Sequence, residues 1–191
     1  KTGTLTEGHP RLLEIEAGKD HKEQDILHFA ASLERGSEHP LAEAIVKGAM
    51  DRGLTLSKAV DFEALTGKGV TGRVDDHDIA LGTALLLDDL GLEAGDWSAR
   101  ADARRDAGET VMFVVIDGAV AGLVRVADPV KETTPAALAA LHDLGFKIVM
   151  ATGDHLRTAK AVAGSLGIDD IRAEVLPADK ARIIKDFQAQ G

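Results

Sequence analysis

The stretch KETTPAALAALHDLGFKIVMATGDHLRTAKAVAGSL, residues 131–166, decides the class of fold. Apolar residues over 131–144 have helical spacing that ends at Gly145, and residues 147–151 make a short apolar strand. The turn Thr152-Gly153-Asp154 follows this strand directly and opens a second helix that continues to Leu166. Helix, strand, turn and helix in this order are typical of a parallel α/β sheet, in which sites lie at the carboxyl ends of strands.

The chain before this stretch has a different pattern, in which a strand and two helices precede several short strands. Apolar residues with helical spacing predict helices over 25–33 and 40–50, and Asp117-Gly118 is a strong signal for a two-residue hairpin turn. Alternating apolar and polar residues predict strands over 11–17, 60–65, 70–74, 79–81, 111–116 and 119–124. These short strands favour antiparallel pairing and an α+β region.

We therefore predict an antiparallel module inserted into an α/β domain. Residues 9–124 are expected to form the inserted domain, and residues 1–8 and 125–191 the discontinuous α/β domain.

Composition excludes several classes of function. The net charge of -10 argues against a nucleic-acid surface, which needs clustered Lys and Arg. The sequence has no cysteine, so it forms neither disulfides nor a thiolate metal site, and its seven histidines lack ligand spacing. We expect no metal site in this chain. No apolar run approaches the roughly 20 residues that span a bilayer, so any membrane spans of a parent protein lie outside it.

Residues 1–6, KTGTLT, are too short for a helix and too rich in hydroxyl residues for a core strand. A glycine that admits an anion to the backbone, beside threonine hydroxyls, is typical of a phosphate-handling turn. The motif resembles the phosphorylation motif of P-type ATPases, Asp-Lys-Thr-Gly-Thr, whose aspartate would precede Lys1. Thr152-Gly153-Asp154 and Asp128-Pro129 match further elements of that family, and residues 177–180 resemble the segment with its phosphate-contacting lysine, here Lys180.

Gly67-Lys68-Gly69 opens a stretch that fits the dinucleotide pattern GxGxxG, but a strand rather than a helix follows it, which excludes a Rossmann site. In P-type ATPases this glycine pair lies against the nucleotide. Residues 37–41, SEHPL, match a signature of the heavy-metal branch of the family. Thr83 stands where that branch usually has asparagine, so an amide contact to the nucleotide is absent.

The resemblance implies roles for particular residues. Glu34 would accept a hydrogen bond from the adenine amino group, and the His39 imidazole would pack on the base or orient phosphates. The residues expected to bind ATP are Glu34, His39, Gly67 and Gly69. Those expected to act on the phosphoryl group are Lys1, Thr2, Thr4, Thr152, Gly153, Asp154 and Lys180.

The implied fold is a partial haloacid-dehalogenase-like phosphorylation domain with an inserted nucleotide-binding domain. The implied function is the ATP-using part of a heavy-metal pump that exports Cu⁺ through an aspartyl phosphate, with ATP and Mg²⁺ as cofactors. The resemblance also implies a transmembrane domain in the same polypeptide, a position at the cytosolic face of the membrane, and a metallochaperone as a partner. Without the aspartate and most magnesium carboxylates, we expect this segment alone to be inactive.

Two alternatives remain open at this stage. One is a soluble phosphatase of the same fold, but such enzymes usually carry a second aspartate two residues after the nucleophile, where this chain has Thr2. The other is a non-catalytic nucleotide-binding module.

Overall fold

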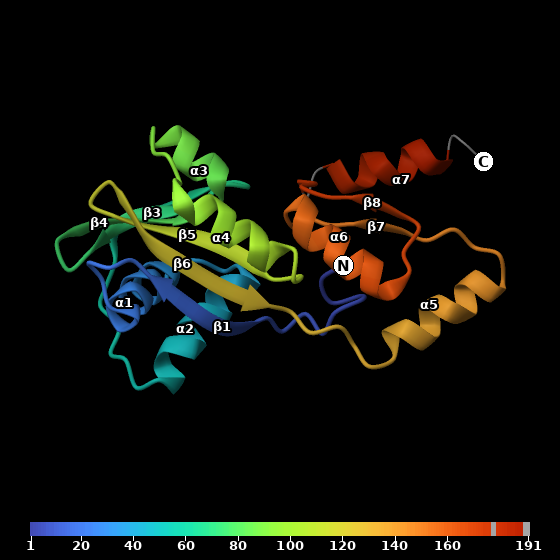
Figure 1. The fold of residues 1–191 in the computed structure, drawn as a ribbon, viewed down its shortest axis with the longest axis horizontal. Coiled ribbons are helices and arrows are strands. Elements are labelled where there is room, and N and C mark those ends of the chain that lie inside the picture. The colour runs from blue at the N-terminus through green and yellow to red at the C-terminus, as the bar shows by residue number, and fades with distance from the viewer. Residues whose placement is uncertain (177–178, 189–191) are drawn as a thin grey trace.

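A six-stranded antiparallel sheet forms the larger part of the computed structural model, which describes residues 1–176 and 179–188 (Figure 1). The strands lie in the order β1-β6-β5-β4-β3-β2. Their bounds are Arg11–Ala17 for β1, Val60–Leu65 for β2, Gly69–Val74 for β3, His77–Gly82 for β4, Thr110–Ile116 for β5 and Ala119–Ala127 for β6. The predicted antiparallel α+β region is thereby confirmed.

Helices cover both faces of this sheet. Helices α1 (Glu23–Glu34) and α2 (Pro40–Asp51) pack on one face, and α3 (Ala84–Asp89) and α4 (Asp96–Arg105) on the other. Alternate residues of β5 enter the two cores: Val114 lies in the core under α1, and Phe113 lies in the core under α4. The period of two therefore buries both faces of the central strands.

The turns follow from residues that tolerate left-handed backbone. Asp117 and Gly118 have φ of 50° and 78°, as a two-residue hairpin turn between β5 and β6 requires. Asp75 and Asp76, with φ of 49° and 66°, join β3 to β4 in the same way. The turn contains only these two residues, because His77 already pairs with Val74 in the sheet.

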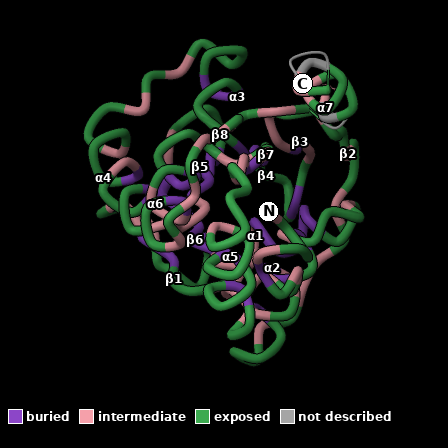
Figure 2. Tube along the Cα trace, turned by 90° about the vertical axis from the view of Figure 1, so that its right-hand side faces the viewer, coloured by how far each residue is buried: buried purple, intermediate pink, exposed green. Residues whose placement is uncertain are grey.

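The smaller part of the molecule contains a parallel pair of strands. β7 (Val149–Ala151) pairs with β8 (Asp170–Arg172), and α5 (Thr134–Asp143), α6 (Leu156–Leu166) and α7 (Lys180–Gln188) accompany them. Figure 2 shows buried residues concentrated along the large sheet, whereas α7 is largely exposed. None of the helices in residues 1–176 and 179–188 is long and apolar enough to cross a membrane.

Two chain segments connect the two parts and are bonded to each other. Thr6 forms an isolated bridge with Val130, and the Asp128 carboxylate accepts from the Thr6 hydroxyl at 2.5 Å and from the Gly8 amide at 3.0 Å. The helix predicted over 131–144 begins later, at Thr134, where the Thr134 hydroxyl donates to the Leu5 carbonyl at 2.8 Å. β6 continues to Ala127, and the division at residues 8 and 124 stays a prediction.

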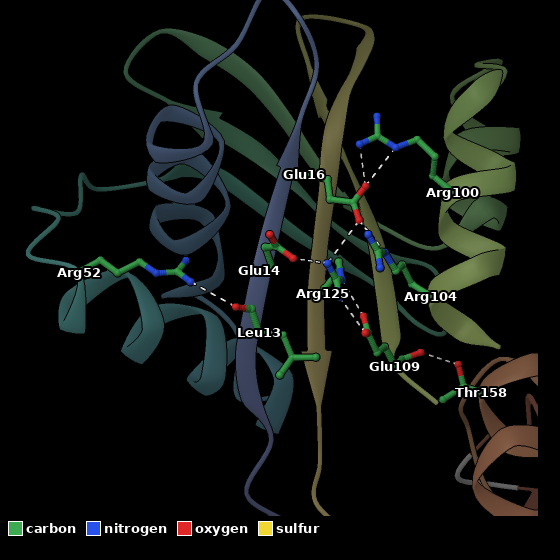
Figure 3. Close-up of polar contacts among 9 residues, drawn as sticks. All are labelled: Leu13, Glu14, Glu16, Arg52, Arg100, Arg104, Glu109, Arg125 and Thr158. Carbon is green, nitrogen blue, oxygen red and sulfur yellow. Dashed lines mark hydrogen bonds and ion pairs between the residues drawn. The ribbon is translucent and has the colours of Figure 1, made fainter. Parts of the chain in front are cut away.

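A network of ion pairs lies between the sheet and α4 (Figure 3). Glu16 of β1 accepts from Arg100 and Arg104 of α4 at 2.7 and 2.9 Å. Arg125 of β6 is buried, pairs with Glu109 at 2.7 Å and also contacts Glu14 and Glu16. The network ties β1, β6 and α4 to Glu109, which directly precedes β5.

Candidate functional site

The first six residues form a tight turn beside the end of β7. The Lys1 carbonyl accepts from the amides of Thr4, Leu5 and Thr6 at 3.1, 2.9 and 3.3 Å. Gly3 has φ of +72°, which a residue without Cβ adopts without strain. The main-chain nitrogen of Lys1 lies 3.3 Å from the Ala151 carbonyl.

Thr2, Gly3 and Thr4 are exposed at the tip of this turn. The side chains of Thr2 and Thr4 therefore lie at the surface of the turn. This leaves both hydroxyls accessible to a ligand.

Lys1, Thr152 and Asp154 meet at the carboxyl end of β7. The Lys1 Nζ lies 2.5 Å from Asp154 Oδ2, and the Thr152 hydroxyl donates to the same oxygen at 2.9 Å. Thr152 is buried, and the Lys1 side chain is only 5% exposed. The Thr152 amide bonds the Arg172 carbonyl at 2.9 Å, so β8 fixes the start of the turn. A cation, a hydroxyl and a carboxylate thus converge where a parallel strand ends, which is where α/β sheets place their sites.

The other residues expected at the phosphoryl end are placed less fully. Gly153 has ordinary backbone torsions, and a Cβ there would lie 3.4 Å from the Val175 carbonyl, so the described residues leave room for a small side chain. Residues 177 and 178 and the side chain of Lys180 lie outside the described part of the chain. The role expected of Lys180 therefore stays a prediction.

Lys131 is a residue that the motif comparison did not single out. Its Nζ donates to the Gly3 carbonyl at 2.8 Å and so holds the turn from the opposite side. One signal could have indicated it: Lys131 lies two residues after Pro129 of the Asp128-Pro129 element. The aspartate of that element accepts hydrogen bonds from Thr6 and Gly8.

The second group of residues lies at the connection between α1 and α2. Glu34 ends α1 and is 6% exposed, and its Oε2 has no hydrogen-bond partner within residues 1–176 and 179–188. Burial raises the pKa of Glu34 to about 7, although a hydrogen bond from Ser37 acts in the opposite direction. The Ser37 hydroxyl also accepts from the His39 amide at 3.3 Å. Ser37, which sequence reasoning treated only as part of a signature, therefore links Glu34 to His39.

His39 is the N-cap of α2. Its Nδ1 accepts from the Leu41 amide at 3.1 Å, so the neutral ring carries its proton on Nε2, which remains available as a donor. The residue is exposed. Burial lowers its pKa, while the charge of Asp154 acts to raise it. The charge of Asp154 therefore acts on the His39 ring although the two residues belong to different parts of the molecule.

Positions 67 and 69 are occupied by glycine for different structural reasons. Gly69 has φ of +149°, and a Cβ there would lie 2.2 Å from the Leu81 carbonyl, so close contact between β3 and β4 requires glycine. Gly67 has φ of +75° in the turn before β3, and a Cβ would lie 3.0 Å from Leu176 Cδ2. The Thr83 amide donates to the Lys68 carbonyl at 2.7 Å, which places Thr83 against the same turn.

Two observations relate these residues across the two parts of the molecule. A Cβ built at position 67 would lie 3.0 Å from Leu176 Cδ2, and the charge of Asp154 acts on His39. Among the described residues, no cluster of three or more His, Cys, Asp or Glu side chains is arranged to hold a metal ion.

Comparison with known proteins places this geometry in a family. The family model described as haloacid dehalogenase-like hydrolase matches residues 1–191. A copper-transporting P-type ATPase of Rhizobium leguminosarum bv. viciae is 56% identical over the whole chain, which spans only 23% of that relative. The catalytic domain of the CPx-ATPase CopB-B is similar with a TM-score of 0.74 at 28% identity, over 100% of this chain and 65% of that one. A zinc-transporting PIB-type ATPase is similar with a TM-score of 0.67 at 33% identity, over 100% and 31%.

Proposed function

This chain belongs to the haloacid dehalogenase-like hydrolase family, and on that premise we propose that it is the ATP-binding and phosphoryl-transfer segment of a P-type heavy-metal cation pump. The chain spans about a quarter of the length of the curated relatives that it matches, so the pump is the parent protein. In that parent the segment would lie at the cytosolic face of the membrane, attached to transmembrane helices of the same polypeptide.

One observation carries the proposal: Lys1 and the Thr152-Gly153-Asp154 turn, distant in sequence, share one carboxylate oxygen. The charge of Asp154 acts on His39 in the other part of the molecule, and Gly67 of that part lies close to Leu176, which supports a shared site. A nucleotide held by the His39 group would therefore direct its phosphates toward the Lys1 cluster. This arrangement supports transfer of a phosphoryl group to a residue beside Lys1.

The residues at the adenine end fit a nucleotide. Glu34 presents a buried carboxylate oxygen without a partner among the described residues, and such a group is costly unless a ligand or water satisfies it. The exocyclic amino group of adenine is a suitable donor. The His39 ring, with its Nε2 proton outward, can pack on the base or donate to a phosphate.

The residues for Mg²⁺ are not among those described. Asp154 is the single carboxylate of the cluster and already bonds Lys1 and Thr152, and no cluster of three acidic or histidine ligands exists in residues 1–176 and 179–188.

The mechanism assigns roles to this chain's own groups. In the parent protein the nucleophilic aspartate would directly precede Lys1 and attack the γ-phosphate to give an aspartyl phosphate. Lys1 and the Thr152 hydroxyl would orient and neutralise the charged oxygens, which is most of what catalysis of phosphoryl transfer requires. With Thr2 in place of a second aspartate, no proton shuttle stands ready to hydrolyse the intermediate, which favours a pump over a soluble phosphatase.

Copper is the metal that we propose for the pump, with Cu⁺ export and delivery by a metallochaperone. The copper-transporting relative, identical at more than half of all positions, supports this assignment, whereas the zinc-transporting neighbour is identical at a third. A metal-transport assay of the full-length parent with Cu⁺ and Zn²⁺ distinguishes the two.

Titration of ADP into the chain tests the proposed nucleotide site. Stacking of a base on an aromatic side chain contributes roughly 1–3 kcal/mol, so His39→Ala is expected to weaken binding by about ten- to a hundredfold. His142→Ala is the matched control, because His142 lies on α5, where it pairs with Asp169 at 3.0 Å. Equal losses in both variants, or no loss in a folded His39→Ala variant, would refute the site.

A further inference from the structure

The two parts of the molecule touch at a second place, away from the connecting segments. There the end of α4 and the residues before β5 lie beside the start of α6 (Figures 1 and 3). Helix α6 begins shortly after the Thr152-Gly153-Asp154 turn. A movement of the start of α6 would therefore occur next to the candidate site.

The contact consists of an arginine that pairs with two aspartates and a buried threonine hydroxyl. Arg157 of α6 lies 3.3 Å from Asp102 and 3.0 Å from Asp106. The Thr158 hydroxyl donates to the Glu109 carbonyl at 2.6 Å, and Thr158 is 1% exposed. Every one of these bonds crosses between the two parts.

The surroundings of the contact are polar rather than closely packed. A cavity of about 660 Å³ adjoins it, lined by charged residues that include Asp106, Arg157 and Lys160. The Arg157 side chain is 47% exposed and that of Asp106 is 55% exposed. Interfaces of this kind between parts of one chain permit relative motion, because little apolar surface is lost when they open.

The far end of the contact is anchored. The Glu109 side chain pairs with Arg125, which is buried in the network with Glu16. The Glu109 carbonyl that receives Thr158 is therefore held by the large sheet, and α6 docks on a fixed point rather than on a mobile loop.

From these contacts we propose that Arg157 and Thr158 form a latch that holds the sheet part closed over the Thr152-Gly153-Asp154 turn. The two connecting segments, which Asp128 joins by hydrogen bonds, act as the hinge. The latch sets the fraction of molecules in which the two parts are closed. This inference does not depend on the proposed pump function.

A distance measurement between spin labels tests the latch. The chain has no cysteine, so Asp88→Cys on α3 and Ser165→Cys on α6 supply two exposed attachment sites, one on each part. Exposed ion pairs contribute little free energy. Arg157→Ala is therefore expected to raise the open fraction about fivefold, equivalent to about 1 kcal/mol. High salt should open the wild type in the same direction but change Arg157→Ala little.

Three further variants make the result specific. Arg157→Asp and Asp106→Arg should each open the molecule, and their combination should restore much of the closed fraction. Thr158→Val removes the hydroxyl with little change in shape and should also open it, about tenfold, because the Glu109 carbonyl loses its donor. Arg182→Ala removes an exposed ion pair with Asp179 near α7 and should have no effect.

The outcomes separate the latch from the function. The residues proposed to bind nucleotide all lie in the sheet part, so Arg157→Ala should bind ADP within about twofold of the wild type. If the label distances of Arg157→Ala and Thr158→Val match those of the wild type at low salt, the latch is refuted whatever the ADP titrations show. Failure of the charge-swapped pair to close again would equally overturn it.

Discussion

The Nζ atom of Lys1 lies 2.5 Å from Oδ2 of Asp154, across 153 positions of sequence. The lysine side chain is 5% exposed and the aspartate 18%, so removal of the carboxylate takes a negative charge away from a nearly buried cation. Asp154→Asn is expected to lower the free energy of unfolding by about 1–3 kcal/mol. Urea unfolding of the wild type and the variant measures this loss.

The control for this prediction uses both partners. Lys1→Met alone should also lower the free energy of unfolding. The double variant Lys1→Met with Asp154→Asn should lose less free energy of unfolding than the sum of the two single variants. Strict additivity would mean that the two groups do not interact in solution.

Glu34 predicts a dependence of stability on pH. Its pKa is raised to about 7 in the folded chain from an ordinary value of 4.5, because burial disfavours the charged carboxylate. Between these values the folded chain binds more protons than the unfolded chain, so this contribution is present below pH 4.5 and is lost as the pH rises through 7. At about 1.4 kcal/mol per pKa unit the full loss is about 3 kcal/mol.

Glu34→Gln checks the sign of this effect. The variant should be more stable than the wild type at pH 8 and similar to it near pH 4.5, as thermal or urea unfolding at both pH values would show. A difference between the two proteins that does not change with pH would exclude Glu34 as the source. Bound ADP should reduce the difference at pH 8 if the adenine amino group satisfies the carboxylate.

Sequence alone predicted the elements that depend on local pattern. The strands over 11–17 and 60–65 have the predicted bounds, and the Asp117-Gly118 turn has the positive φ angles that a two-residue hairpin needs. Period and turn chemistry are properties of neighbouring residues, so they are readable without the fold. The strand β8 was missed because Asp170–Arg172 has only three residues, of which Ile171 alone is apolar.

The site was predictable in its parts but not in its arrangement. Motifs indicated Lys1, Asp154 and His39, yet nothing local indicated that Ser37 would link Glu34 to His39. Gly69 was expected to be glycine because of a nucleotide, whereas the structure gives it a reason inside the sheet. Such partners depend on which strands become neighbours, and periodicity does not determine that.

The ion-pair network under α4 predicts the opposite pH behaviour to Glu34. Burial acts to raise the pKa of Glu16, but hydrogen bonds from Arg104 and Arg100 outweigh it and lower the pKa below its ordinary value. Its stabilisation is therefore present above pH 4.5 and is lost as the pH falls through the lowered value. Glu16→Gln should cost about 3 kcal/mol at pH 7, and this cost should decrease as the pH falls below 4.5.

Urea unfolding at pH 7 and pH 3 measures this decrease. Glu132→Gln serves as the control, since Glu132 is exposed and should change stability by less than about 0.5 kcal/mol at either pH. Equal costs for Glu16→Gln at pH 7 and pH 3 would contradict the assignment of the effect to its charge.

Gly67 and Gly69 allow a direct comparison of two reasons for glycine. An alanine Cβ at position 69 would lie 2.2 Å from the Leu81 carbonyl and 2.6 Å from Gly82 Cα, and backbone on an adjacent strand cannot move without breaking the pairing of β3 and β4. At position 67 the Cβ would meet, among the described residues, only Leu176 Cδ2 at 3.0 Å, the end of a flexible and 45% exposed side chain. Gly69→Ala is therefore expected to lower the free energy of unfolding by roughly 3 kcal/mol or more, and Gly67→Ala by about 1–2 kcal/mol from the positive φ alone.

Gly53→Ala is the control for the effect of backbone conformation. Gly53 has φ of +75°, and no described atom lies within 4 Å of a Cβ built there. Its loss of stability in urea unfolding should match that of Gly67→Ala. Gly67 is proposed to bind the nucleotide, and its substitution should cost little stability. A loss of ADP affinity in a folded Gly67→Ala variant would therefore assign that turn to the nucleotide, and a variant that kept full affinity would remove Gly67 from the site.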